Sequence, residues 1–349
     1  MKPLTASSWR PAPWQTEFAR AVKDPAELLR MLELGEELLP QARRAAELFP
    51  LRVPRNFVAR MRKGDALDPL LLQVLPLGRE LEDTPDFSTD PVGDLAAMTV
   101  PGVLHKYHGR VLLVLTGACA VHCRYCFRRH FPYNDANPAT DHWNAALDYL
   151  RADPSISEVI FSGGDPLALS DVRLAELVAQ LDTIPHLQRL RIHTRVPVVL
   201  PERVDDALLH WISASRLDVV MVLHINHANE LDDTTRAAFA QLERAGARLY
   251  NQSVLLRGIN DTAQVLQNLS EALFTARVTP YYLHLLDRVT GAAHFDIPET
   301  QARVLMDEVH TRLPGYLVPR LVREQAAAPY KTPVAAFTTA VALSPFKTI

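Results

Sequence analysis

All three cysteines of this 349-residue chain lie within one short stretch, TGACAVHCRYCFRRHFPY at residues 116–133. Cys119, Cys123 and Cys126 follow the spacing Cys-x3-Cys-x2-Cys. Thiolates at positions i, i+4 and i+7 of an irregular loop can ligate three irons of a [4Fe-4S] cluster. The fourth iron then has no protein ligand, so it can coordinate a substrate or a cofactor.

The same three thiols also fit a different metal. A tetrahedral Cys3His zinc site completed by His122 or His130 has the right number of ligands, and such a chain would be a binding protein rather than an enzyme. The spacing alone leaves both interpretations open. An odd number of clustered cysteines indicates a metal or redox site in a reducing compartment, because a disulfide framework needs pairs.

Short apolar runs rich in β-branched residues alternate with helix-like stretches, which is typical of parallel βαβ units. A partial (β/α) barrel and a doubly wound sheet both satisfy this pattern. The runs lead into the cysteine cluster and into SGGDP, HTR, HINH, NQS and HLLDR. Because a parallel barrel builds its active site at the carboxyl ends of its strands, we expect these segments to converge. The predicted strands are 111–116, 157–162, 190–194, 218–225, 248–256 and 278–284, and the predicted helices are 171–183, 203–214, 232–245 and 261–275.

Residues 1–95 predict a helical N-terminal region, because Leu, Ala, Arg and Glu recur there at nearly helical spacing. A formal net charge of −3 with both signs interspersed provides no basic stripe for a nucleic acid. The first residues lack the apolar run of a signal peptide, and no apolar stretch of 18 residues occurs. We therefore expect a cytoplasmic protein with neither nucleic-acid nor membrane partners.

The cysteine spacing, with aromatic residues at Tyr125 and Phe127, resembles the signature of the radical S-adenosylmethionine (SAM) superfamily. Over roughly residues 95–340 the chain resembles the PLP-dependent lysine 2,3-aminomutase family of these enzymes. The segments that carry this resemblance are GRVLLVLTGACAVHCRYCFRRHF, FSGGDPL, LHINHANE, YNQSVLLRGIND, HLLDRVTGAAHF and KTPV. The N-terminal WQTEFARAVKDPAELLRML resembles the bacterial subgroup that supplies (R)-β-lysine for modification of elongation factor P.

The resemblance implies an α/β fold with three parts. A helical N-terminal region, 1–95, precedes a radical SAM partial (β/α)6 TIM-type barrel, 96–313. A C-terminal segment, 314–349, then carries the lysine that binds pyridoxal 5′-phosphate (PLP).

Three cofactors are implied by the resemblance: a [4Fe-4S] cluster, SAM and PLP. The three cysteines would ligate the cluster, and the amino and carboxylate groups of SAM would chelate its fourth iron. Lys331 of APYKTPV would hold PLP as a Schiff base. Gly163, Gly164, Asp165 and His224 would line the SAM site, and Tyr107, Arg110 and Gln252 would lie at the PLP phosphate.

The lysine content bears on the PLP assignment, since a Schiff base needs a lysine and this chain has six. Four lie near the chain ends or in the predicted helical region, which leaves Lys331 and, as the alternative, Lys106. The family usually has a run of glycines before the lysine, whereas this chain has QAAAPYK, a departure that puts the flexibility of the loop in question. The other four lysines are Lys2, Lys23, Lys63 and Lys347.

Several assigned residues also have purely structural interpretations. Gly163 and Gly164 fit a tight turn between a strand and a helix. His224 fits a buried histidine of an apolar strand, and Arg110 and Arg128 fit surface ion pairs. In family register, each residue is instead expected to lie in the site.

Three further residues are assigned to the substrate by the resemblance. Arg128 would pair with the carboxylate of lysine, which suits a planar guanidinium. Asp287 and Glu324 would receive the distal ammonium, although lysine-specific relatives have Asp where this chain has Glu324. Two anions around one buried ammonium favour lysine over a dicarboxylic substrate.

The implied reaction converts L-lysine to β-lysine by moving the amino group from C2 to C3. One electron from the reduced cluster would cleave SAM to a 5′-deoxyadenosyl radical that takes the C3 hydrogen, while PLP assists the migration. The partners implied are L-lysine, an external one-electron reductant and, indirectly, elongation factor P. The same chemistry on another amino acid is the alternative, and a homo-oligomer and the product stereochemistry are left open.

Overall fold

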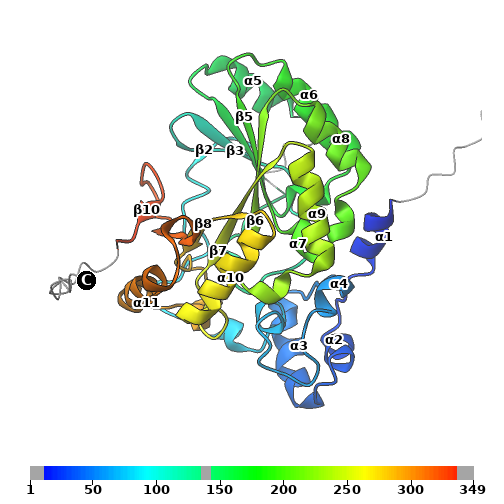
Figure 1. Ribbon diagram of the computed structural model, residues 1–349, viewed down its shortest axis with the longest axis vertical. Helices are drawn as coiled ribbons and strands as arrows, with labels where there is room; N and C mark the ends of the chain where they lie inside the picture. Colours follow the sequence, from blue (N-terminus) through cyan, green and yellow to red (C-terminus); the bar gives the residue numbers. More distant parts are fainter. Residues whose placement is uncertain (1–11, 135–142, 336–349) are drawn as a thin grey trace, which may run out of the picture.

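The computed structural model describes residues 12–134 and 143–335, and its centre is one continuous sheet. The ten strands of the sheet follow one another in sequence order. Figure 1 shows helices α6, α8 and α9 along the outer side of the sheet and the N-terminal helices α2, α3 and α4 beyond one end of it. The strands are β1 Met98–Val100, β2 Val103–Tyr107, β3 Arg110–Val114, β4 Glu158–Ser162, β5 Arg189–Thr194, β6 Asp218–His224, β7 Arg248–Val254, β8 Thr279–His284, β9 Arg320–Arg323 and β10 Thr332–Pro333.

Strands β3 to β9 run parallel, whereas β1, β2 and β10 pair antiparallel at the two ends of the strand order. The six predicted strands correspond to β3 to β8, so the predicted partial barrel is confirmed. Their apolar runs are buried, as in β4, where Val159, Ile160 and Phe161 all lie in the interior. Strand β9 extends the parallel array by a strand that the sequence pattern did not predict.

Helices α8, α9 and α10 begin at side chains that accept hydrogen bonds from the first turn. The Asp205 carboxylate accepts from the amide of Leu208 before α8, and the Asp232 carboxylate accepts from the amide of Thr235 before α9. The four predicted helices correspond to α6, α8, α9 and α10, while α5, α7 and α11 were not predicted. The ranges are α5 Asn144–Ala152, α6 Asp171–Asp182, α7 Val196–Val199, α8 Asp206–Ala214, α9 Asp233–Arg244, α10 Ala263–Thr275 and α11 Glu299–Arg312.

The N-terminal region is only partly helical, because most of residues 59–97 form turns and irregular segments. Its buried side chains, such as Leu28, Phe57 and Leu71, belong to the same hydrophobic core as Phe161 of β4. The predicted boundary at residue 95 is not tested by this packing and stays a prediction. The helices of this region are α1 Pro13–Ala19, α2 Pro25–Met31, α3 Leu39–Leu48 and α4 Arg55–Val58.

None of the helices in the described part of the chain combines the length and the apolar composition needed to cross a lipid bilayer.

Candidate active site

The predicted site residues gather where the parallel strands end. The cysteine loop follows β3, Gly163 follows β4, and His224 is the last residue of β6. Asp287 lies three residues after β8, and Glu324 directly follows β9. The expectation that the strand ends converge is therefore confirmed, with β9 contributing an additional end.

Two glycines hold the cysteine loop against the end of β4. The amide of Gly164 donates to the carbonyl of Thr116 at 2.6 Å, and a Cβ on Gly164 would lie 2.5 Å from the carbonyl oxygen of Ala118. Gly163 has φ +130°, and a Cβ there would lie 2.5 Å from the carbonyl oxygen of Thr116. Larger residues would push the loop away, so this tight turn has a structural role whether or not it also contacts SAM.

Asp165 ties this turn to the end of β5. Its carboxylate accepts from the Thr194 hydroxyl at 2.7 Å and from the amides of Arg195 at 2.7 Å and Leu167 at 3.1 Å. Burial raises the pKa of Asp165 to about 6, although these hydrogen bonds act in the opposite direction. The side chain thus supports the two strand ends that flank the cysteine loop.

The three thiols are free and half-buried. Burial, followed by the charges of the neighbouring thiols, raises the pKa of Cys126 to about 11 and that of Cys119 well above its usual value. A cationic iron centre relieves this cost by stabilising the thiolates. The donor set therefore fits a [4Fe-4S] cluster.

The zinc interpretation finds less support in the geometry. No three His, Cys, Asp or Glu side chains within residues 12–134 and 143–335 are arranged to hold a single metal ion. A cluster binds each thiolate to a different iron, so its ligands need not meet at one centre. His122 donates from Nδ1 to the carbonyl of Pro50 at 2.7 Å.

Lys331 and Glu324 come together because β9 and β10 form an antiparallel pair. Thr332 lies opposite Arg323 in this pair, and the neighbouring Lys331 donates from Nζ to the Glu324 carboxylate. Burial tends to raise the pKa of Glu324, but the charges of Lys331 and Lys106 outweigh it and lower this pKa to about 2. The Glu324 carboxylate is therefore charged in this pair.

Lys106 lies in the same cluster but is held more tightly. Its ammonium contacts the Asp94 carboxylate at 2.6 Å, the Val92 carbonyl at 2.8 Å and the Glu324 carboxylate at 3.3 Å. Within the described chain, Glu324 is the only hydrogen-bond acceptor recorded for Lys331. Lys331 is therefore the more available of the two amines, although the geometry brings both to the site.

Arg128 is buried rather than placed in a surface ion pair. Its Nε donates to Asp94 at 2.7 Å and its Nη1 donates to the Ser162 hydroxyl at 2.8 Å. Beside it opens a pocket lined in part by Asp94, Phe127 and Phe131. Two hydrogen-bonded nitrogens fix the plane of the guanidinium, and its contact with a substrate carboxylate stays a prediction.

Three histidines from different strands, His193, His224 and His284, lie near Lys331. Burial and nearby cations, Lys331 among them, lower the pKa of His224 to about 3 and those of the other two well below the usual value, so all three are neutral. Gln252 donates from its amide to Nε2 of His224 at 2.8 Å. The buried Nε2 atoms of His193 and His284 have no partner in the described structure. Unpaired buried nitrogens beside a lysine fit a polar cofactor such as PLP.

Tyr107 and Arg110 face each other across the β2–β3 hairpin. The Arg110 guanidinium lies 4.7 Å from the centre of the Tyr107 ring. Burial and then the charge of Glu324, to which the hydroxyl is hydrogen-bonded, raise the pKa of Tyr107. The pair therefore borders the Lys331 cluster, and its contact with a phosphate stays a prediction.

Asp287 is half-buried and lies close to a second carboxylate, that of Glu324. Burial, followed by the charge of Glu324, raises the pKa of Asp287 to about 7, while Lys331 and Lys106 act in the opposite direction. Two carboxylates in one buried region favour a cationic ligand between them.

The fold and the cysteine site define a radical SAM enzyme, and residues 113–263 match the Radical SAM superfamily. The chain is 53% identical to L-lysine 2,3-aminomutase of Escherichia coli (strain K12), over 92% of this chain and 94% of that protein. It is 49% identical to the Haemophilus influenzae L-lysine 2,3-aminomutase, over 91% and 94%, and 32% identical to that of Clostridium subterminale, over 95% and 80%. The chain belongs to the L-lysine 2,3-aminomutase family. This membership implies a [4Fe-4S] cluster, SAM and PLP, which the residues described above fit.

Sequence reasoning did not identify two buried residues of the site. Asp94, which joins Arg128 and Lys106, lies within residues 1–95, for which the sequence predicted only a helical region. Arg195 belongs to the HTR segment at the end of a predicted strand. That position was the sequence feature that could have indicated a role in the site. Neither residue stands out by type, because their roles depend on contacts across the fold.

Proposed function

We propose that this protein converts L-lysine to β-lysine by moving the amino group from C2 to C3. The observation that carries the proposal is that a cationic side chain and a pair of acidic side chains lie at the same edge of the sheet. Arg128 is oriented beside a pocket, and Asp287 and Glu324 form an acidic region near Lys331. An α-amino acid with a distal ammonium matches this division of charge.

The cofactors supply the chemistry that no side chain provides. When bound, the cluster and SAM supply one-electron chemistry that removes hydrogen from an unactivated carbon, and PLP supplies an electron sink for the migrating nitrogen. Cys119, Cys123 and Cys126 would ligate the cluster, and Lys331 would bind PLP. Gly163, Gly164, Asp165 and His224 would border SAM, and Tyr107, Arg110 and Gln252 would border the PLP phosphate.

The side chains of the protein bind and orient the substrate. Arg128 would bind its carboxylate, because Asp94 and Ser162 already fix the guanidinium plane. Asp287 and Glu324 would bind its distal ammonium. A dicarboxylic substrate would bring like charges together in a buried region, so these residues favour lysine.

Glu324 has a second partner in this arrangement. In the structure its carboxylate accepts a hydrogen bond from Nζ of Lys331, so the amine is engaged until this contact is broken. We infer that binding of the substrate ammonium at Glu324 competes with this pair. The longer arm of Glu compared with Asp supports such a double role.

The proposed product is (R)-β-lysine for modification of elongation factor P. The resemblance of WQTEFARAVKDPAELLRML to that bacterial subgroup supports this assignment. Three free thiols and a reducible cluster also support a reducing, cytoplasmic setting and an external one-electron reductant.

Anaerobic incubation with SAM, PLP, a one-electron reductant and L-lysine, followed by identification of the product, tests the proposal. β-Lysine is the expected product, and chiral separation assigns its configuration. If the enzyme converts another amino acid faster than lysine, that amino acid is the substrate instead of lysine. Purified protein that takes up zinc but no iron after anaerobic reconstitution would contradict the enzyme assignment.

A further inference from the structure

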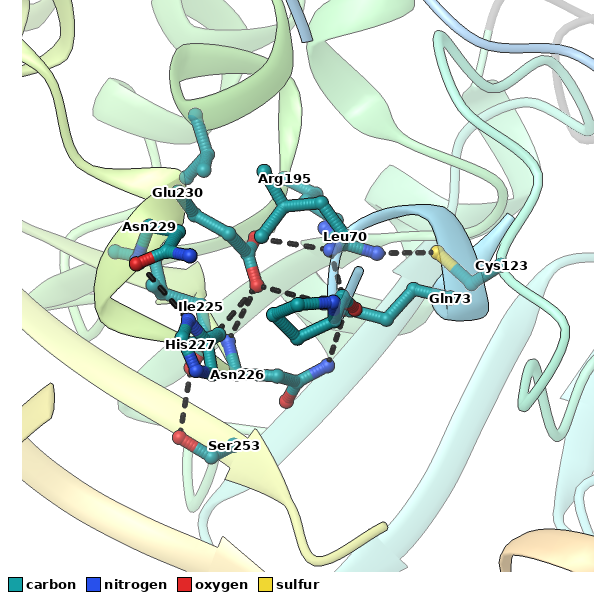
Figure 2. Close-up of polar contacts among 12 residues, drawn as sticks. Leu70, Gln73, Cys123, Arg195, Ile225, Asn226, His227, Asn229, Glu230 and Ser253 are labelled. Atoms are coloured by element: carbon teal, nitrogen blue, oxygen red, sulfur yellow. Dashed lines mark hydrogen bonds and ion pairs between the residues drawn. The ribbon is translucent and has the colours of Figure 1, made fainter. Parts of the chain in front are cut away.

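Arg195 contacts the cysteine loop from the end of β5. Its Nη1 donates to Cys123 Sγ at 2.9 Å and to the Tyr125 hydroxyl at 2.7 Å. Its Nη2 donates to the Gln73 side-chain oxygen at 2.6 Å and to the Glu230 carboxylate at 2.9 Å. Figure 2 shows the guanidinium between Glu230 and Cys123, with Gln73 beside it. The residue is 4% exposed, so these contacts are shielded from water.

The partners of Arg195 are themselves fixed. Glu230 is fully buried, and its other carboxylate oxygen accepts from the amides of Asn226 at 2.9 Å and His227 at 3.1 Å. The backbone amide of Arg195 donates to Asp165 at 2.7 Å. Because the backbone amide and both terminal nitrogens of Arg195 are hydrogen-bonded, its guanidinium has little freedom to turn away from the sulfur.

Gln73 of the N-terminal region adds further hydrogen bonds to the residues around Arg195. Its side-chain oxygen also accepts from the Asn226 amide at 3.0 Å and from the Tyr125 hydroxyl at 3.3 Å. Its amide nitrogen donates to Glu230 at 3.2 Å. The network therefore links the N-terminal region, the ends of β5 and β6, and the cysteine loop.

A pairing with Glu230 alone would not require Arg195 to reach the sulfur. Glu230 already occupies Nη2, whereas Nη1 is directed at Cys123 and Tyr125. A charged donor at a ligand sulfur stabilises the additional negative charge of a reduced cluster, and hydrogen bonds to sulfur are among the factors that set cluster potentials. The arrangement therefore has a consequence for electron transfer.

We propose that Arg195 is a positioning residue that orients Cys123 and raises the reduction potential of the cluster that Cys123 ligates. This inference rests on the proposed ligation of a [4Fe-4S] cluster by the three cysteines. It concerns the electron entering the cluster rather than the binding of lysine.

The test compares Arg195→Gln, Arg195→Lys and Arg203→Gln with the wild-type full chain. Arg203 is the matched control, because its guanidinium is also fully buried and paired with a carboxylate, Asp171 at 2.8 Å, but its recorded bonds avoid the cysteines. Each protein is reconstituted anaerobically without SAM. Iron and sulfide are quantified, and the reduced cluster is titrated by electron paramagnetic resonance.

The expected result is that Arg195→Gln keeps its iron but is harder to reduce. At a fixed potential the ratio of reduced to oxidised cluster should fall about tenfold, which is about 59 mV for a one-electron couple. Arg195→Lys should recover part of the loss, and Arg203→Gln should match wild type. Equal potentials in wild type and both Arg195 variants would overturn the inference while leaving cluster binding intact.

A wild-type measurement covers the case in which Arg195→Gln does not fold. In protein labelled with 15N only at the guanidinium nitrogens of arginine, pulsed resonance of the reduced cluster should detect a weak 15N coupling, because the Arg195 guanidinium donates to Cys123 Sγ. Absence of this coupling would overturn the inference. Failure of wild type itself to assemble a cluster would instead refute the proposed function on which the inference rests.

Discussion

Lys331 and Glu324 face each other across the β9–β10 pair, and the ammonium of Lys331 donates to the carboxylate of Glu324. The residue proposed to bind PLP is thus in direct contact with a residue proposed to bind the substrate ammonium. The charge of Lys331 contributes to the low pKa of Glu324. Chemistry at one residue therefore changes the electrostatics of the other.

Cys123→Ala should abolish both the broad absorbance at about 400 nm of the reconstituted cluster and the reductive cleavage of SAM, because the sequence has no fourth cysteine to replace it. Visible spectroscopy and an assay for 5′-deoxyadenosine check this outcome. A variant that retains wild-type iron content and SAM cleavage would show that Cys123 is not a ligand.

Borohydride reduction of the PLP-loaded protein should leave the pyridoxyl label on Lys331. Lys106 is the internal comparison, because it lies in the same cluster but is bound by Asp94, Val92 and Glu324. Peptide mapping by mass spectrometry distinguishes the two sites. A label on Lys106 that survives in Lys331→Ala would reverse the assignment.

Asp287→Asn should reduce kcat/KM for lysine by an amount equivalent to roughly 2–5 kcal/mol, because it removes one anion from a buried ammonium site. Steady-state kinetics with L-lysine measures this loss. Asp296→Asn is a control at a carboxylate near the exposed Arg288, away from Lys331. Unchanged kcat/KM in Asp287→Asn would refute the proposed basis of specificity.

The stability of the protein without cofactors or substrate should depend on pH through Asp287. The folded protein has a pKa of about 7 at Asp287, above the usual 3.8, so it binds more protons than the unfolded chain between about pH 4 and pH 7. Its contribution to stability is therefore present at low pH and is lost as the pH rises through this range.

Urea unfolding at pH 5 and pH 8 checks this dependence. Asn has no titrating carboxyl, so Asp287→Asn should lose less stability than wild type between the two values, with a difference on the order of 1 kcal/mol or more. The variant would then be less active but more stable at pH 8. If wild type and Asp287→Asn lose the same free energy of unfolding between pH 5 and pH 8, the raised pKa of Asp287 is contradicted.

Gly164→Ala should reduce iron incorporation, because the new Cβ would lie 2.5 Å from the carbonyl oxygen of Ala118 and displace the cysteine loop. Overpacking of this kind costs about 1–3 kcal/mol. Gly315→Ala is the matched control, since no atom lies within 4 Å of its added Cβ. Iron analysis and thermal unfolding separate a local effect on the loop from loss of the fold. Equal iron content in both variants would contradict the close packing.

The six strands of the barrel were predictable because each contains a short run of apolar or β-branched residues, most of them buried or half-buried. Strand β9 was not, since its four residues include Arg320 and Arg323 and its pairing with β8 joins distant segments. The cysteines were recognisable from spacing that is local in the sequence. Arg195 was not, because its contact with Cys123 spans 72 residues.

The turn that contains Gln73 sets a limit on how this enzyme can be recombined with its relatives. Residues 113–263 carry the superfamily match, yet the Gln73 oxygen that accepts from Arg195, Asn226 and Tyr125 lies outside them. A chimera joined between Gln73 and the barrel would leave these three donors facing a side chain from a different protein at this position. Crossovers for domain exchange therefore belong upstream of this turn, so that the inherited unit includes the segment that encloses the cysteine loop.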